Sequence, residues 1–91
     1  MDWNTPPPGF RTVIFDLTQP AENVYRYYCI TWQTDLFGEG AVVRSYGRKG
    51  GWTRILSTPF DSLETAWPFI RRTIKTRLRH GYQVVEVEAG S

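Results

Sequence analysis

The hydrophobic pattern changes its period once, near residue 60, and this change limits the folds open to the chain. Before that point the apolar segments are short, rich in β-branched and aromatic residues, and separated by turn residues, as in strands joined by tight turns. From residue 61 to 81, apolar residues recur every three or four positions, which is the period of a helix. The order predicts an α+β fold, in which one long α-helix in the C-terminal half packs on one face of an antiparallel β-sheet meander.

The best strand candidate is 24–34, which carries large residues on both faces. Its side chains Val24, Tyr28, Ile30 and Trp32 share one face and are expected to enter the core. The other expected strands are 11–17, 41–46 and 52–57, and 82–88 is either a last strand or an extended tail.

The expected helix has recognisable ends. Asp61 is a good N-cap, Glu64 completes a capping-box-like pattern, and Gly81 ends the helix. Pro68 lies inside the predicted helix, where a proline removes a hydrogen bond. It is expected either to kink the helix or to open its main segment. The predicted apolar stripe consists of Leu63, Ala66, Trp67, Ile70, Ile74 and Leu78.

The length of 91 residues predicts one domain. Three consecutive prolines predict an extended tail over residues 1–10, which leaves 11–88 as the single domain. No apolar run approaches the ~20 residues that a membrane span needs, and the first residues lack the features of a secretion signal. A cytoplasmic location without membrane partners is therefore expected.

The net charge of +2 is distributed unevenly. Residues 1–43 carry two basic and five acidic side chains, 44–80 carry nine basic and two acidic ones, and 81–91 add two glutamates. A solvated basic face needs no ligand, but a block of this kind favours a polyanionic partner.

The segment 44–54, RSYGRKGGWTR, places this charge beside aromatic rings. A symmetric hairpin would put Tyr46 opposite Trp52, and Arg44 opposite Arg54, with all four on one face. Two directly opposed arginines are destabilising unless an anion lies between them. Phosphates pair with arginine and bases pack on rings, so this pattern suits nucleic acid. The predicted binding residues are Arg44, Tyr46, Arg48, Lys49, Trp52 and Arg54, with Lys75 and Arg79 of the helix as a second patch.

No catalytic motif is apparent. The single cysteine, Cys29, and single histidine, His80, exclude a disulfide framework and the common zinc spacings. Phosphate-binding loops, metalloprotease motifs and nucleophile elbows do not occur. We therefore expect neither an enzyme, nor a cofactor, nor a metal site.

Three stretches carry a family resemblance: LFGEGAVVRSYGRKGGWTRI, FDSLETAW and KTRLRHGY. An Asn-x-x-Arg-Tyr-Tyr motif that starts at Asn23 precedes them. Together these features make residues 14–83 similar to a WGR domain, a family named for its Trp-Gly-Arg signature. The resemblance is close to the short stand-alone bacterial members. The resemblance implies a sheet with one helix across it, and DNA binding as in poly(ADP-ribose) polymerases. The role of the signature Trp, packing on nucleic acid, would fall on Tyr46, and contacts with another protein or domain would fall on Arg48. Two departures are that Tyr46 replaces the Trp and that the turn after Arg48 is shorter.

Two functions follow as hypotheses. The first is a non-catalytic nucleic-acid-binding module that contacts the backbone of DNA, rather than RNA, without sequence specificity. The alternative is a protein-interaction module that recognises an acidic partner, because Tyr, Trp and Arg also dominate protein interfaces.

Overall fold

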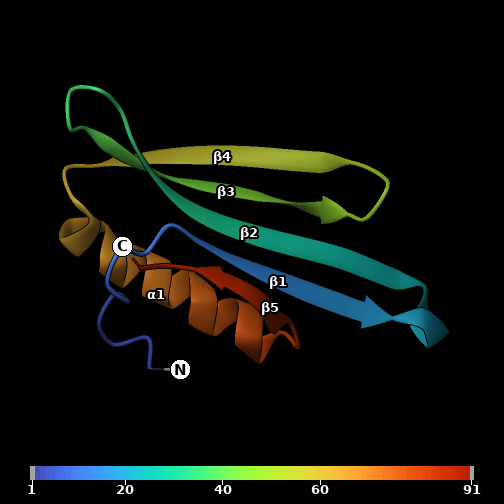
Figure 1. The fold of residues 1–91 in the computed structure, drawn as a ribbon. Helices are drawn as coiled ribbons and strands as arrows, with labels where there is room; N and C mark the ends of the chain where they lie inside the picture. The colour runs from blue at the N-terminus through green and yellow to red at the C-terminus, as the bar shows by residue number, and fades with distance from the viewer. Residues whose placement is uncertain (1, 91) are drawn as a thin grey trace.

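The computed structural model describes residues 2–90 as a five-stranded antiparallel sheet with one long helix on one face (Figure 1). The elements are β1 (Thr12–Gln19), the 3₁₀ helix η1 (Pro20–Glu22), β2 (Val24–Thr34), β3 (Gly40–Arg48), β4 (Thr53–Phe60), α1 (Leu63–Arg79) and β5 (Gln83–Glu88). Across the sheet the strand order is β4-β3-β2-β1-β5, so that β5 pairs with β1. The predicted fold class is confirmed, and the segment after the helix is a strand.

The core lies between α1 and the centre of the sheet. Alternate residues of β1 and β2 face the helix, and the pairs Val13–Ile30 and Phe15–Tyr28 are directly opposite each other. From the helix, the predicted stripe contributes Ala66, Trp67, Ile70 and Ile74 as buried residues. Of the side chains expected from β2, Tyr28 and Ile30 are buried, Trp32 packs against the core while half-buried, and Val24 is half-buried at the strand end.

The N-terminal segment, expected to be a tail, contributes to this core. Trp3 and Phe10 are both buried, and their rings lie 6.4 and 5.2 Å from that of Trp67. The indole Nε1 of Trp67 donates a hydrogen bond of 2.8 Å to the carbonyl oxygen of Trp3. The N-terminal segment is therefore anchored to the helix on both sides of its proline run.

The start of α1 differs from the predicted one. Ser62 is the N-cap, and its hydroxyl accepts from the Thr65 N–H while the Thr65 hydroxyl accepts from the Ser62 N–H. The expectation of an Asp61–Glu64 box was wrong because the helix begins one residue later. Pro68 neither opens nor ends the helix, which is continuous through it. No helix in the described part of the chain is long and apolar enough to cross a membrane.

Candidate nucleic-acid interface

The β3–β4 hairpin is shifted relative to the symmetric prediction. Tyr46 lies opposite Arg54, not Trp52, and Arg44 lies opposite Leu56. The shift arises in the turn, where Gly50 takes a φ of 73°, a conformation that favours glycine. Because the change in pairing is two residues, the alternation of faces is unchanged, and Arg44, Tyr46 and Arg54 still share the face toward the helix.

Arg48 is held by neighbouring structure. Its guanidinium donates to the carbonyl oxygen and the side-chain Oδ1 of Asn23, at 2.9 and 3.1 Å, and lies over the ring of Tyr25. Asn23 itself has a positive φ of 56° at the end of η1, a left-handed conformation that asparagine adopts more readily than most residues, so Arg48 braces this turn. The directly opposed arginines of this sheet are Arg26 and Arg48, in place of the predicted pair.

Lys49 is tied to β1. Its ammonium forms an ion pair with Asp16 and a hydrogen bond of 3.0 Å with the Thr18 hydroxyl. The pKa of the Asp16 carboxyl lies below its usual value. The hydrogen bond from Lys49 is the main cause, and the hydrogen bond from Thr18 is the second. Of the two cations at the hairpin tip, Lys49 is therefore neutralised within the domain, whereas Arg48 bonds only to uncharged groups.

The two aromatic residues of the hairpin have different environments. Tyr46 is half-buried and stacks on Tyr28, with ring centroids 5.1 Å apart and planes 9° from parallel. Trp52, at the turn, is 56% exposed, and none of the aromatic pairs of residues 2–90 includes it. Trp52 is therefore the freer ring for contact with a ligand.

The basic residues of α1 are divided between two surfaces. Lys75 and Arg79 are exposed one turn apart on the solvent side of the helix. Arg72 and Arg77 reach toward the sheet and line a cleft with Arg44.

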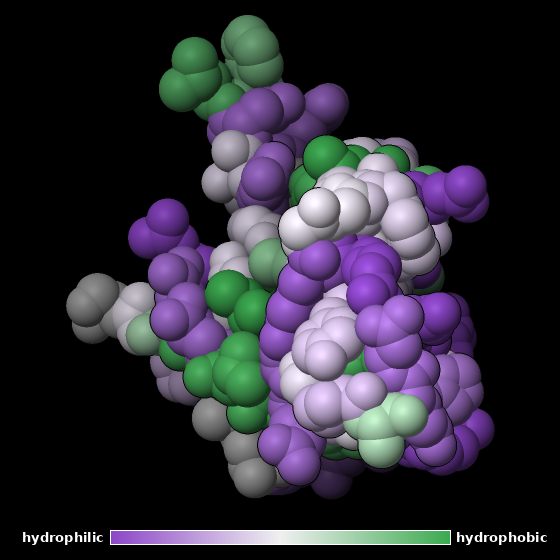
Figure 2. Space-filling model, turned by 90° about the vertical axis from the view of Figure 1, so that its right-hand side faces the viewer, coloured by the Kyte–Doolittle hydropathy of each residue, from purple (hydrophilic) through white to green (hydrophobic). Residues whose placement is uncertain are grey.

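Most of the positive charge has no carboxylate partner. Of the eleven lysines and arginines, Lys49 is the one that forms an ion pair within residues 2–90. Figure 2 views the end of the molecule that carries the β3–β4 turn and η1, where hydrophilic side chains lie beside a paler surface. Apart from Lys49, the charges of the basic block are therefore not neutralised by a carboxylate of residues 2–90.

Comparison with known protein families identifies the family of this chain. A model of the WGR domain matches residues 11–89, almost the whole chain. This chain belongs to the WGR domain family. The family is non-catalytic and is a nucleic-acid-binding type of module in proteins related to poly(ADP-ribose) polymerase. Curated proteins and solved structures gave no match.

The signature of this WGR domain is Tyr46-Gly47-Arg48, at the end of β3. Gly47 is buried, and a Cβ there would collide with the carbonyl oxygen of Trp52 across the hairpin. Its neighbours are the stacked tyrosine and the arginine that holds the Asn23 turn. The three signature positions therefore shape the hairpin from which Trp52 projects.

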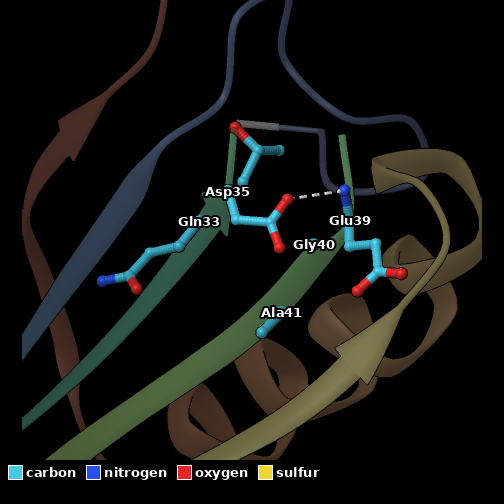
Figure 3. A pocket seen from close by; sticks show the side chains of 6 residues that line it. Gln33, Asp35, Glu39, Gly40 and Ala41 are labelled. Carbon is cyan, nitrogen blue, oxygen red and sulfur yellow. Dashed lines mark hydrogen bonds between the residues drawn. The ribbon is translucent and has the colours of Figure 1, made fainter. Parts of the chain in front are cut away.

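The opposite end of the sheet presents another surface. The β2–β3 turn forms a hollow of about 210 Å³ in which Asp35 and Glu39 lie close together (Figure 3). The Asp35 carboxylate accepts hydrogen bonds from the N–H groups of Phe37 and Glu39, at 2.8 and 3.0 Å. Since it holds two acidic side chains, this hollow is unsuited to a polyanion.

Proposed function

We propose that this WGR domain is a non-catalytic module that binds nucleic acid, DNA in preference to RNA, through the sugar-phosphate backbone. The observation that carries the proposal is an exposed Trp52 ring in a hairpin that also carries exposed Arg54, whose charge has no carboxylate partner within residues 2–90. Stacking on a ring is sequence-tolerant, and phosphate contacts carry no sequence information. The expected preference is accordingly for the structure of the nucleic acid and not for its sequence.

The residues of the site have separate roles in this proposal. Trp52 packs on a base or sugar, and Arg54, which is exposed and two residues further along the chain, contacts phosphate. Tyr46, Arg48 and Lys49 act mainly by holding the hairpin, since each is engaged with a neighbouring element. Phosphate contacts also come from Arg44, Lys75 and Arg79.

The test is a fluorescence-anisotropy titration of nicked, blunt and single-stranded DNA, and of RNA of the same sequence. Trp52→Ala is expected to weaken binding by about five- to a hundredfold, the range for loss of one stacked base. Phe37→Ala is the matched control, because that ring is 89% exposed but lies beside acidic residues at the other end of the sheet. Equal losses in both variants, or no binding of any nucleic acid at low salt, would reject the proposal.

The same titration separates the nucleic-acid proposal from recognition of an acidic protein. A polyglutamate peptide carries similar charge without sugars or bases. If it binds as tightly as DNA and is equally sensitive to Trp52→Ala, the acidic-partner alternative replaces the proposal.

A further inference from the structure

A cleft between α1 and the sheet gathers three arginines. Its volume is about 270 Å³, just below the range of pockets for drug-sized ligands. Arg44 enters it from β3, and the helix contributes Phe69, Arg72, Arg77 and the two threonines Thr73 and Thr76. This cleft lies on the face of the sheet that the helix covers, whereas the ion pair between Lys49 and Asp16 lies on the opposite face.

Aromatic rings orient the three guanidinium groups. Those of Arg44 and Arg72 both lie over the ring of Phe69, at 5.0 and 5.8 Å from its centroid. That of Arg77 lies 4.7 Å over Tyr28. Groups held in this way lose less conformational entropy when they bind a ligand than free surface arginines do.

Two of these arginines have unsatisfied donors. The Nε atoms of Arg44 and Arg77 are buried and have no hydrogen-bond acceptor within residues 2–90. The hydroxyls of Thr73 and Thr76 donate to the carbonyl oxygens of Phe69 and Arg72, both at 2.9 Å. Neither hydroxyl accepts a hydrogen bond from the Nε of Arg44 or Arg77. An unpaired buried donor destabilises the fold, and neighbouring like charges add to that cost.

We propose that this cleft binds a phosphoryl group, with the forks of Arg44 and Arg77 as its ligands and Arg72 at its exposed mouth. The planar fork of arginine matches two oxygens of a phosphate, which a single-atom anion such as chloride cannot offer. The phosphoryl group can belong to a nucleic acid, in which case the proposal rests on the function proposed above, or to a free nucleotide.

The first experiment uses inorganic phosphate alone and therefore does not depend on nucleic-acid binding. Phosphate titrated into the ¹⁵N-labelled protein, against sodium chloride of equal ionic strength, is expected to shift the amides of residues 69–77 saturably. Arg77→Gln and Arg72→Gln are expected to weaken the affinity at least fivefold. Arg77→Lys, which keeps the charge but loses the fork, should weaken it as well. Arg11→Gln is the charge-matched control, since Arg11 is exposed and lies outside the cleft.

Folding is monitored by thermal melting, and Arg72→Gln keeps the test decisive if Arg77→Gln unfolds, because Arg72 is exposed. No saturable shift with phosphate, or equal loss in Arg11→Gln, would overturn the proposal. Phosphate binding without DNA binding would leave the cleft standing and reject the proposed function. DNA binding that is insensitive to Arg72→Gln, without phosphate binding, would leave the proposed function standing and reject the phosphoryl site in the cleft.

The source of the phosphoryl group is distinguished by three further ligands. A mononucleotide that binds more than tenfold tighter than inorganic phosphate identifies a free nucleotide. A blunt duplex that binds tighter with terminal phosphates than without them identifies an end group. Equal affinity of the two duplexes, with sensitivity to Arg72→Gln, identifies an internal phosphodiester.

Discussion

Replacement of Tyr46 by alanine tests whether this signature residue supports the fold. The ring of Tyr46 is half-buried and stacks on Tyr28, which lies in the core. Trp52, six residues away, is mostly exposed and belongs to no aromatic pair of the described chain. Tyr46→Ala should therefore reduce stability, whereas Trp52→Ala should reduce binding.

The expected magnitude follows from the contacts. Removal of a fully buried aromatic side chain costs about 3–5 kcal/mol, and a stacked pair contributes about 0.5–1.5 kcal/mol beyond the area it buries. For the half-buried Tyr46 we expect a loss of about 2 kcal/mol in the free energy of unfolding. In a domain of this size such a loss lowers Tm by roughly 8–16 °C. Trp52→Ala should change the free energy of unfolding by no more than about 0.5 kcal/mol.

The assay is urea denaturation together with differential scanning calorimetry of both variants and of Tyr46→Phe. The phenylalanine variant keeps the ring but removes a hydroxyl that makes no hydrogen bond within residues 2–90, so its Tm should stay close to that of the parent protein. A Tyr46→Ala protein as stable as the parent, with DNA affinity lost, would show that Tyr46 packs on the ligand and does not support the fold.

Three further predictions concern the hairpin, the helix and pH. Gly47→Ala should destabilise the domain strongly, as measured by urea denaturation, because the added Cβ meets the Trp52 carbonyl oxygen; a melting curve like that of the parent would contradict this. Ser62→Ala should lower the free energy of unfolding by about 1 kcal/mol through loss of the cap, and no change would reject the capping role. Asp16→Asn should lower Tm at pH 7. The lowered pKa of Asp16 stabilises the fold above the usual carboxyl pKa, and this contribution is lost as the pH falls through the folded-state pKa. The Tm difference should therefore disappear in acid, and a pH-independent difference would contradict the assignment.

The sequence was sufficient for the fold because its strongest signals are local. The segment 24–34 was predicted with the bounds that the structure gives it, and the helical stripe identified the buried residues Ile70 and Ile74. Both predictions depend on periodicity, which a chain carries whatever its tertiary contacts are. The burial of Trp3 and Phe10 was missed because the prolines between them gave a stronger local signal than two isolated rings.

The site was less predictable, because side-chain partners depend on register and tertiary packing. The segment 47–51 contains three glycines, and the one that takes the positive φ sets the register of the hairpin. This register decides whether Tyr46 lies opposite Trp52 or opposite Arg54, and the sequence does not specify it. The use of Arg48 to hold Asn23 depends on a contact between residues 25 positions apart. The cleft of Arg44 and Arg77 exists only after the helix has docked on the sheet.

The salt dependence of DNA affinity decides whether this surface recognises phosphate groups. With phosphate contacts from Arg44, Arg54, Lys75 and Arg79, the slope of log K against log salt should be about −3 to −4 for a duplex, a loss of roughly a hundredfold between 50 and 200 mM. Arg54→Gln should make the slope less steep by about one. Affinity that is independent of salt, or a slope unchanged by Arg54→Gln, would contradict phosphate recognition by this surface.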